Sequence, residues 1–539
     1  MSFDFPISRR HAAALLGAAL GAPWAAPAGA QGASITPTPA SAPVRGGTLR
    51  WALLVEPQTL VPINTTAGGP VDIGPKVVEG LLRYDAQLNP QPLLATAWEI
   101  SPDGLRYTFR LRQGVKWHDG QPFTSADVAH AIGLLKQYHP RGRATFAQVR
   151  EVRTPDAHTA VLLLDKPAPY LLTALASAES PIVPRHLYEG RDLASNPYNR
   201  APVGTGPFLF KEWVKGSHVT LVRNPDYWDA PRPYLDQIVG RFITDAAARA
   251  AALEAGDIDI AGNAVPVGEL DRFARLPALR IDNSAWPYQG QHNQIVLNHE
   301  TPALQKREVR RAIAQAISIE GINKRAWFGK GVPSATAIGV ASRYHAASIA
   351  FHPFDPAASE RLLDQAGLPR AAGGRRLALR LASNPYTDRR IADIVRQSLQ
   401  KVGIDAVLRE YDFGTYVNKI YTERDFDITV ESESNLFDPT VGVQRLYWSK
   451  NFQIGLPFSN AGHYVNAEVD RLLEAAAVEP DEARRRALFA QFQQAVWDDV
   501  AVIDIGKPPE SVITSRRLAD DQPSAERVYG SFAGLYFVG

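Results

Sequence analysis

The sequence contains no cysteine among its 539 residues. This absence excludes disulfide bonds, cysteine nucleophiles and metal sites built on thiolates. It also excludes a lipid anchor, which needs a cysteine at the cleavage site of an exported chain. After the N-terminal region, no apolar run approaches the length of a membrane-spanning helix. The processed chain is therefore expected to be soluble.

The sequence also has no large excess of charge of one sign. It contains 58 lysines and arginines and 56 aspartates and glutamates, so its net charge is +2. Such a balance does not indicate nucleic acid or an anionic membrane as a partner. The composition, 45% hydrophobic and 21% charged, is ordinary for a folded soluble protein. Because single cores stop growing near ~250–300 residues, the chain is expected to form more than one domain.

Recognisable catalytic motifs are absent too. There is no Gly-x-Ser-x-Gly nucleophile motif and no phosphate-binding loop that ends in Gly-Lys-Ser/Thr. The pair His299–Glu300 lacks the second histidine of a zinc protease, and Pro302 would break the required helix. The twelve histidines are scattered, so we expect no metal, no cofactor and no enzyme activity. One enzymatic alternative stays open, a secreted hydrolase with paired carboxylates such as Asp427 with Glu431 or Glu431 with Glu433.

The first thirty residues have the layout of a signal peptide. Arg9 and Arg10 precede an apolar run of small residues, and Ala28-Gly29-Ala30 forms a small-x-small cleavage site. The paired arginines resemble a twin-arginine export signal, with a general secretory signal as the alternative. Cleavage near Ala30 would leave a flexible leader at 31–45 and place the protein in the periplasm.

The chain alternates strand and helix patterns. Leu49, Trp51 and Leu53 alternate along a half-buried strand, and Thr124 with Asp127 forms a capping box before a helical pattern. Similar patterns elsewhere predict strands and helices along most of the chain. This mixture indicates an α/β fold.

The clearest unit runs from strand 377–381 through helix 387–402 to strand 404–408, and a further strand is predicted at 426–430. A strand-helix-strand unit needs a crossover, which implies parallel neighbours in an α/β sheet. Ligands gather at the carboxyl ends of strands in such sheets. The residues just beyond, 431–435, are therefore predicted to form the wall of a pocket.

Four stretches of the sequence form a recognisable series: GGTLRWALLVEPQTLVP, LATAWEISPDGLRYTFRLRQGVKWHDGQPFTSADV, PVGTGPFLFKEW with VRNPDYW, and LNHETPALQKREVRRAIAQAIS. Together they resemble the solute-binding proteins of family 5, which serve ABC importers for dipeptides, oligopeptides, nickel complexes and related solutes. The second stretch is close to the family signature, and the similarity runs in order from Gly46 to the end of the chain.

The resemblance implies a fold. It predicts a two-lobed α/β clamshell of the type II periplasmic-binding-protein class, in its large form with an extra subdomain in lobe 1. Lobe 1 would comprise 46–289 plus 507–539, and lobe 2 would comprise 290–506. The two crossings of the hinge are expected near Tyr288–Gln294 and Ile505–Pro508.

The resemblance also implies a function. The protein would capture a peptide or peptide-like small solute between its lobes and deliver it to an ABC permease and ATPase complex at the inner membrane. It would act as a monomer and without nucleic acid. A binding protein that signals through a sensor is an alternative.

The expected ligand anchors of the family are replaced in this chain. Dipeptide and oligopeptide binders carry Trp-x-x-Asp before an Asp/Glu-Pro turn, and counting back from Pro439 places Ser432 and Asn435 at those positions. Asparagine cannot neutralise a peptide ammonium, although a buried charge needs a partner. The arginine that holds the ligand carboxylate corresponds to Ala382. A free dipeptide is therefore disfavoured as the solute.

Other residues are expected to contact the solute instead. Glu431 and Glu433 offer a displaced negative charge, unless they are a solvated strand end. For His292, a histidine with satisfied hydrogen bonds is a more ordinary interpretation than a metal ligand, and the aromatic candidates can equally belong to the core. The predicted substrate-binding residues are Thr65, Thr66, Trp286, Tyr288, His292, Ser383, Asn384, Ser432, Glu433, Ser434 and Asn435.

Overall fold

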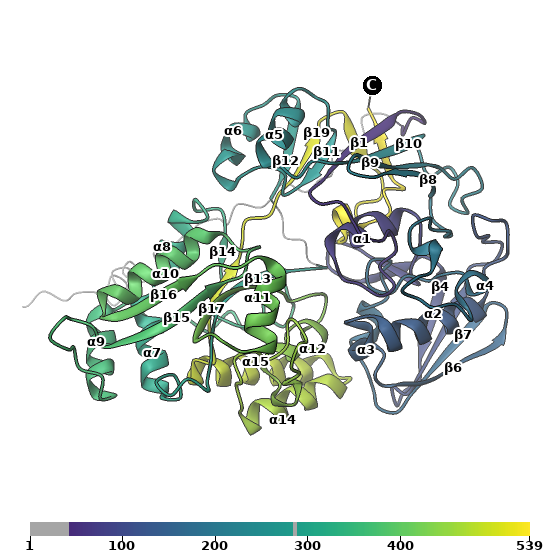
Figure 1. Cartoon of the computed structure of the whole chain (residues 1–539). Helices are drawn as coiled ribbons and strands as arrows, with labels where there is room; N and C mark the ends of the chain where they lie inside the picture. Colours follow the sequence, from purple (N-terminus) through teal and green to yellow (C-terminus); the bar gives the residue numbers. More distant parts are fainter. Residues whose placement is uncertain (1–41, 284–287, 539) are drawn as a thin grey trace, which may run out of the picture.

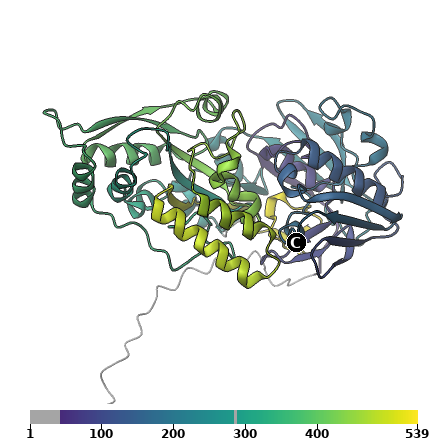
Figure 2. The same cartoon turned by 90° about the horizontal axis from the view of Figure 1, so that it is seen from below.

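The protein forms two lobes that lie side by side (Figure 1). The computed structural model describes residues 42–283 and 288–538. The predicted signal peptide, most of the predicted leader and Trp286 lie outside the described residues. We call the part with the seven-stranded and four-stranded sheets lobe 1, and the part with the six-stranded sheet lobe 2. Figure 2 shows the two lobes again after a quarter turn.

The larger sheet of lobe 1 is mixed. Its strands follow the order β12 (Leu279–Asp282), β19 (Val512–Ser515), β11 (Ile260–Gly262), β1 (Thr48–Leu53), β10 (Gln237–Phe242), β9 (His218–Arg223) and β8 (Phe208–Val214). Strand β1 is parallel to both neighbours. Leu49, Trp51 and Leu53 of β1 are buried, which confirms the alternation predicted for this strand. Helix α5 (Ala246–Glu254) packs on the sheet through Leu253.

A second, antiparallel sheet forms the extra subdomain of lobe 1. Its order is β4 (Ala95–Ile100), β5 (Arg106–Leu111), β7 (Thr159–Leu164) and β6 (Val149–Asp156). Helix α2 (Ser125–Tyr138) packs on it through apolar residues such as Val128 and Leu135, which share a core with Phe109. The capping box of Thr124 and Asp127 is confirmed, with the Thr124 N–H donating to Asp127 Oδ2 at 2.8 Å.

The six strands of lobe 2 follow the order β14 (Val332–Pro333), β18 (Val502–Lys507), β13 (Gln291–Leu297), β17 (Ile428–Ser434), β15 (Leu377–Ser383) and β16 (Ile404–Arg409). Strand β15 is parallel to β16 and β17, which confirms the predicted parallel unit. Strand β13 is antiparallel to β17 and β18.

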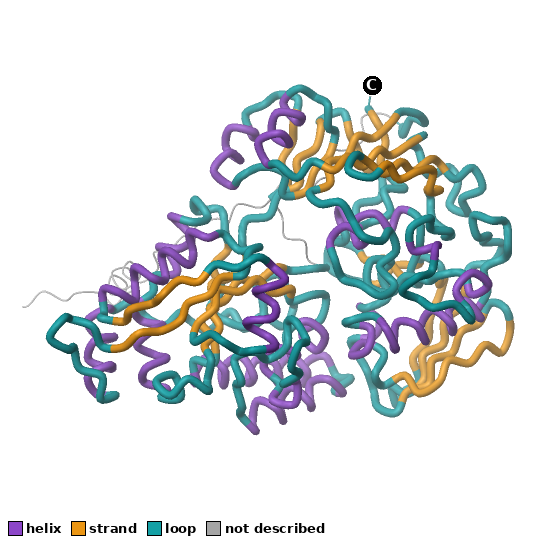
Figure 3. The backbone as a smooth tube through the Cα atoms, in the orientation of Figure 1, coloured by secondary structure: helices purple, strands orange, loops and turns teal. Residues whose placement is uncertain are grey.

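Helices cover both faces of this sheet (Figure 3). On one face, α7 (Arg307–Ala316) and α10 (Arg389–Lys401) pack on the sheet in a core that includes Val430. On the other face, α11 (Phe413–Val417) packs near Val296, and α14 (Ala467–Val478) and α15 (Glu482–Asp499) form a second layer. Helices α8 (Ile319–Arg325) and α9 (Pro356–Gln365) complete the lobe, with α9 at its far end (Figure 1).

Short elements complete the described chain. The two small sheets pair β2 (Leu82–Tyr84) with β3 (Pro90–Pro92), and β20 (Leu518–Asp520) with β21 (Leu535–Phe537). The remaining helices are α1 (Gly68–Ile73), α3 (Gly142–Thr145), α4 (Arg185–Tyr188), α6 (Leu270–Ala274), α12 (Pro439–Gly442) and α13 (Gln444–Tyr447).

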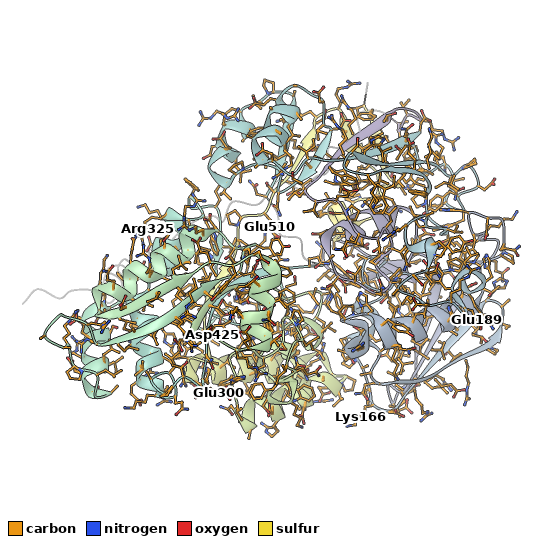
Figure 4. All side chains as sticks on the ribbon, viewed as in Figure 1. Lys166, Glu189, Glu300, Arg325, Asp425 and Glu510 are labelled. Atoms are coloured by element: carbon orange, nitrogen blue, oxygen red, sulfur yellow. The ribbon has the colours of Figure 1, made fainter. Side chains whose placement is uncertain are left out.

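The chain passes between the lobes twice. It leaves lobe 1 after β12 and enters lobe 2 at the start of β13, and it returns between β18 and β19. Gln291 to Gln294, expected at the first crossing, lie inside β13, and Ile505 and Gly506 lie inside β18. Glu510, labelled in Figure 4, lies on the return segment between the two lobes.

The lobes share an apolar contact beside these crossings. Leu436, Phe437 and Val441 of lobe 2 belong to the same buried cluster as the core of lobe 1. The Tyr288 ring lies between Tyr84 and Phe437, at centroid distances of 5.2 and 5.0 Å. Burial of these side chains stabilises this relative placement of the lobes.

A second contact joins the lobes through charge and one ring. Lys330 Nζ of lobe 2 lies 2.5 Å from Asp271 Oδ1 of α6 in lobe 1. The Phe328 ring of lobe 2 lies close against Gly268 of lobe 1. A further contact runs from Arg343 Nη2 of lobe 2 to the Gln87 carbonyl of lobe 1 at 3.2 Å, so the lobes are joined by segments that are far apart in the sequence.

Within residues 42–283 and 288–538, no helix combines the length and the apolar character that crossing a membrane requires.

Candidate functional site

The strand order brings several strand ends to one edge of lobe 2. Strand β13 starts at Gln291, directly after the crossing from lobe 1, so its first residues lie at the edge that faces lobe 1. Ser434 at the end of β17 pairs with Gln291, which places the carboxyl end of β17 at the same edge. Strands β15 and β16 are parallel to β17, so Ser383 and Arg409 end there too. This edge is the candidate site.

Glu431 is buried at this edge within a network of neutral donors. Its side chain is 1% exposed. The hydroxyl groups of Tyr416 and Tyr421 both donate to Glu431 Oε1, the latter at 3.0 Å, and Asn384 Nδ2 donates to Oε2 at 2.8 Å. Burial raises the pKa of Glu431, while these three hydrogen bonds lower it. The network joins the loop after β15 to β17 and to the helix that follows β16.

Glu433 lies two residues further along the same face and is paired differently. Its side chain is 2% exposed, and Arg445 Nη2 donates to Oε2 at 3.0 Å. Burial raises the pKa of Glu433 to about 8; the charge of Arg445 lowers it, and the charge of Glu431 adds to the rise. Glu433 therefore holds its proton more tightly than an exposed glutamate does.

The interpretation of these glutamates as a solvated strand end is wrong. The strand was predicted to end at Val430, but β17 continues to Ser434 because its pairing with β13 continues through Gln291. Glu431 and Glu433 thus point from a paired strand on a covered sheet face rather than from a loop.

A small cavity adjoins the two carboxylates. The volume in which the centre of a water molecule fits is about 20 Å³. Its walls come from β13, β17, the helix after β16 and the segment before α14, and they include Gln294, Thr429, Tyr447 and Asn460. Tyr447 donates its hydroxyl proton to Gln294 Oε1 at 3.2 Å. The lining combines polar side chains with apolar ones such as Val296, Leu446 and Val502, and the space is about that of one water molecule.

Asp427, the third acid of the proposed catalytic pairs, lies at the opposite end of β17. Arg380 Nη2 donates to its Oδ1 at 2.7 Å, and the Thr301 hydroxyl donates to the same oxygen at 2.7 Å. Asp425, labelled in Figure 4, lies two residues earlier and also bonds to Arg380. These acids join β15 to the start of β17 and lie away from the candidate site.

Asn435 uses its side-chain amide within lobe 2. Its Oδ1 accepts a hydrogen bond from the Gly339 N–H at 2.5 Å, and its Nδ2 donates to the Ala337 carbonyl at 3.3 Å. A Cβ atom at Gly339 would lie 2.8 Å from Asn435 Oδ1, so only glycine allows this close approach. Asn435 also lines a second small cavity, which includes Leu88 of lobe 1 and Gly290 at the crossing.

The serines of this stretch point to the other face of β17. Ser432 donates its hydroxyl proton to Gln291 Oε1 at 3.2 Å, and Ser434 Oγ accepts from Gln291 Nε2 at 3.0 Å. Both serines are half-buried. Successive side chains of a strand point to opposite faces, so Ser432 and Ser434 lie on one face of β17 and Glu431 and Glu433 lie on the other.

His292 and Tyr288 are buried beside the first crossing. His292 Nε2 lies 2.8 Å from Asp504 Oδ1, and the His292 side chain is 1% exposed. Tyr288 is fully buried between two aromatic rings of the protein. Both residues therefore belong to the packed framework of the site.

The remaining candidates fall on both lobes. Ser383 Oγ lies 3.0 Å from Thr387 Oγ1 at the end of β15. Thr65 and Thr66 are half-buried in lobe 1, directly before α1, and Thr65 Oγ1 accepts from the Ala67 N–H at 3.2 Å. Ala382 is buried in the core beneath α11. The predicted residues thus form one group on each lobe, with the larger group on lobe 2.

Comparison with known proteins decides the family. The family profile described as bacterial extracellular solute-binding proteins, family 5 Middle, matches residues 89–453. A Brucella ovis protein described as an ABC transporter peptide-binding protein is 31% identical over 434 residues, covering 77% of this chain and 79% of its own. The chain belongs to solute-binding protein family 5.

Solved structures of this family share the fold. The oligopeptide-binding protein AppA from Bacillus subtilis, solved with a nonapeptide, superposes with a TM-score of 0.80 at 25% identity, covering 92% of this chain and all of that one. The binding protein AgaA from A. tumefaciens R10, solved with agropinic acid, has a TM-score of 0.77 at 26% identity, covering 92% of this chain and 99% of that one. The predicted two-lobed clamshell of type II is confirmed.

Four residues of this family 5 site were not predicted from the sequence. Tyr416 and Tyr421 reach Glu431 from the segment after β16, Arg445 pairs with Glu433, and Gln294 lies opposite Glu431 on β13. The run of four polar residues at Gln291–Gln294, in a segment otherwise apolar through Leu297, was the one available signal. The others are brought to the site by tertiary packing alone.

Proposed function

We propose that this family 5 protein captures a peptide or peptide-like small solute between its lobes and delivers it to the permease and ATPase complex of an ABC importer. The observation that carries the proposal is the placement of the site at the edge of lobe 2 that faces lobe 1, in a chain of a solute-binding family. Peptide binding by the relatives supports the peptide-like class, since one is described as peptide-binding and another was solved with a nonapeptide.

The contacts proposed for the solute come from both lobes. Thr65 and Thr66 contribute hydroxyl groups from lobe 1, and the loop of Ser383 and Asn384 faces them from lobe 2. Within lobe 2, the end of β17 is the proposed floor: Ser432 and Ser434 lie on one face of the strand, Glu433 lies on the other, and Asn435 follows the strand end. Tyr288 and His292 shape this floor from behind, because their side chains are already packed against protein groups.

A free dipeptide is not the proposed solute. Position 382 is a buried alanine, and the Asn435 amide is hydrogen-bonded to the 337–339 loop. Neither position supplies an ionic partner for a terminal ammonium or carboxylate, and a buried terminal charge without a partner is costly.

Catalysis is not part of the proposal. Every oxygen of Glu431 already accepts a hydrogen bond, and Glu433 is paired with Arg445. The cavity between them has room for about one water, whereas glycoside hydrolysis needs a sugar unit between two carboxyl groups. Sustained turnover of a glycoside or peptide by the pure protein would contradict this part of the proposal.

The two connections between the lobes are the proposed hinge, between lobe 1 at 46–289 plus 507–539 and lobe 2 at 290–506. Strand β18 extends through Lys507, so the return connection follows that residue. Closure around a solute should compact the molecule. An unchanged radius of gyration in small-angle X-ray scattering, with the solute bound, would argue against hinge closure.

The proposed location is the periplasm, after removal of a signal peptide near Ala30. Export by the twin-arginine route is the favoured form of this proposal. Replacing Arg9 and Arg10 together by lysine should then stop export, as measured by the yield in the periplasmic fraction. An unchanged yield would assign export to the general secretory route.

The decisive experiment is identification of the solute. The protein is purified under native conditions from cells that express its own importer, and released small molecules are identified by mass spectrometry. A peptide or peptide-like compound that rebinds to the stripped protein in titration calorimetry supports the proposal. Stable rebinding of the released compound together with normal uptake in a strain that lacks the importer would instead favour a sensor.

A further inference from the structure

A solvent-exposed aromatic pair stands at the same edge of lobe 2 as the candidate site. The Tyr386 side chain is 73% exposed. Its ring lies 4.8 Å from the ring of Phe413, with an angle of 47° between the planes. Phe413 is half-buried and supports Tyr386 from behind. An aromatic ring held in water by another ring is an unusual surface feature, because two large apolar groups meet there.

The strand order explains why this pair adjoins the site. Tyr386 lies in the loop that follows β15, and Phe413 is the first residue of α11, which follows β16. The carboxyl ends of β15 and β16 point to the same edge as that of β17, which carries Glu433 and is followed by Asn435. The aromatic pair therefore stands at these strand ends, and Tyr386 shares its loop with Asn384, a proposed solute contact.

The same hydrogen-bond network that surrounds Glu431 also positions Tyr386. The Tyr386 N–H donates to Asn384 Oδ1 at 2.9 Å, and Asn384 Nδ2 donates to Glu431 Oε2 at 2.8 Å. Asp412 fixes the start of α11, which carries Phe413, because its Oδ1 accepts a hydrogen bond from the Thr415 N–H at 3.0 Å and so caps the helix. Both rings are thus presented on ordered backbone, which lowers the entropy cost of binding something to them.

The two next most exposed aromatic side chains of the described residues lack this context. Phe328, 48% exposed, lies against Gly268 of lobe 1 and so belongs to a contact between the lobes. Phe354, 57% exposed, lies just before α9, at the end of lobe 2 that Figure 1 shows farthest from lobe 1. Tyr386 combines high exposure, a supporting ring and a place beside the site.

We infer that Tyr386, supported by Phe413, receives an aromatic or large aliphatic side group of the bound solute and so sets the preference of the protein for such solutes. This inference rests on the proposed function. The tyrosine ring offers a flat apolar surface, and its hydroxyl group keeps the free protein wetted at the open edge. Stacking or edge contact with a side group of the solute would remove water from both rings.

The test uses two pools of synthetic peptides of three to nine residues, identical except that one pool replaces every aromatic and large aliphatic residue by serine. Apparent affinity is measured by the thermal shift of the stripped full-length protein. We expect the wild type to prefer the apolar pool. Tyr386→Ala should weaken binding of the apolar pool about tenfold and leave binding of the serine pool unchanged. Tyr386→Phe should retain the preference, since it keeps the ring.

Controls separate the possible failures. Phe354→Ala removes another exposed ring of lobe 2 far from the site, and it should change neither affinity. An equal loss for both pools in Tyr386→Ala would overturn the inference, since the ring would then act on lobe closure or on the peptide backbone. No change in either pool would also overturn it. Failure of the wild type to bind either pool would contradict the proposed peptide function itself, and the inference would fall with it.

Discussion

Each lobe contains a fully buried glutamate that accepts three hydrogen bonds from neutral donors, yet the two differ in what they join. In lobe 1, Glu79 accepts from Thr205 Oγ1 at 2.8 Å, from the Tyr227 hydroxyl at 2.8 Å and from Trp228 Nε1 at 3.0 Å. In lobe 2, Glu431 accepts from two tyrosines and one asparagine. The local chemistry is nearly the same.

Their positions in the fold are different. The donors to Glu79 all come from a single stretch of lobe 1, so the network holds the segment after α1 to that stretch. Glu431 joins three segments that meet at the edge facing lobe 1, and a second glutamate and a cavity lie beside it. The comparison teaches that similar hydrogen bonding around a buried carboxylate can hold one segment in place, as at Glu79, or join several segments at the candidate site, as at Glu431.

The largest expected effect is on stability, at Glu79. Glu79→Leu leaves three buried donors without an acceptor, and each such group costs ~1–3 kcal/mol. We expect the free energy of unfolding, measured in urea, to fall by at least about 3 kcal/mol. A loss below about 1 kcal/mol would show that water enters to satisfy these donors. The structural role that the comparison assigns to Glu79 would then be wrong.

The next effect separates stability from binding. Glu431→Gln places an amide N–H₂ group against donor groups of Asn384 or the tyrosines, which should displace the loop after β15. We expect affinity for the co-purified solute to fall about tenfold in calorimetry, a loss of about 1.4 kcal/mol. Glu79→Gln is the matched control, since it makes the same chemical change far from the site and should leave affinity within about twofold. Equal losses in the two variants would remove the functional distinction between the two glutamates.

A smaller effect is expected at Asn435. Asn435→Asp removes the donor to the Ala337 carbonyl and adds a carboxylate near that carbonyl, so it should weaken solute binding by several-fold. Asn435→Ala should cost about 0.5–1.5 kcal/mol, one neutral hydrogen bond. Titration calorimetry of both variants checks this order. Tighter binding in Asn435→Asp would mean that the solute is cationic at this end, against our interpretation of the missing anchor.

The smallest effect concerns pH. The folded protein raises the pKa of Glu433 from 4.5 to about 8, so it binds this proton more tightly than the unfolded chain does. The stability that Glu433 contributes is therefore complete below about pH 4.5 and is lost as the pH rises to about 8. Glu433→Gln should lose less in melting temperature between pH 5 and pH 8 than the wild type, by about 2–4 °C. Identical pH profiles would show that Glu433 is ionised throughout, as the partner of Arg445.

Much of the fold follows from local patterns that the sequence carries by itself. Strand alternation at Leu49 to Leu53, the capping box of Thr124 and Asp127, and the parallel unit around β15 and β16 all depend on residues close together in the chain. The predicted helix 387–402 differs from α10, Arg389–Lys401, by two residues at its start and one at its end. Periodicity and capping act within a few residues, so they can be predicted without knowledge of the fold.

The candidate site depended on long-range pairing. The sequence alone determined that polar residues follow a predicted strand at 431–435, but it placed the end of that strand four residues too early, because the partner strand β13 lies more than 130 residues away. Only the tertiary structure decided that Glu431 and Glu433 are buried, and that Tyr416, Tyr421 and Arg445 surround them. Burial and hydrogen bonding between distant segments depend on which strands become neighbours, and no local pattern in a single sequence specifies that choice.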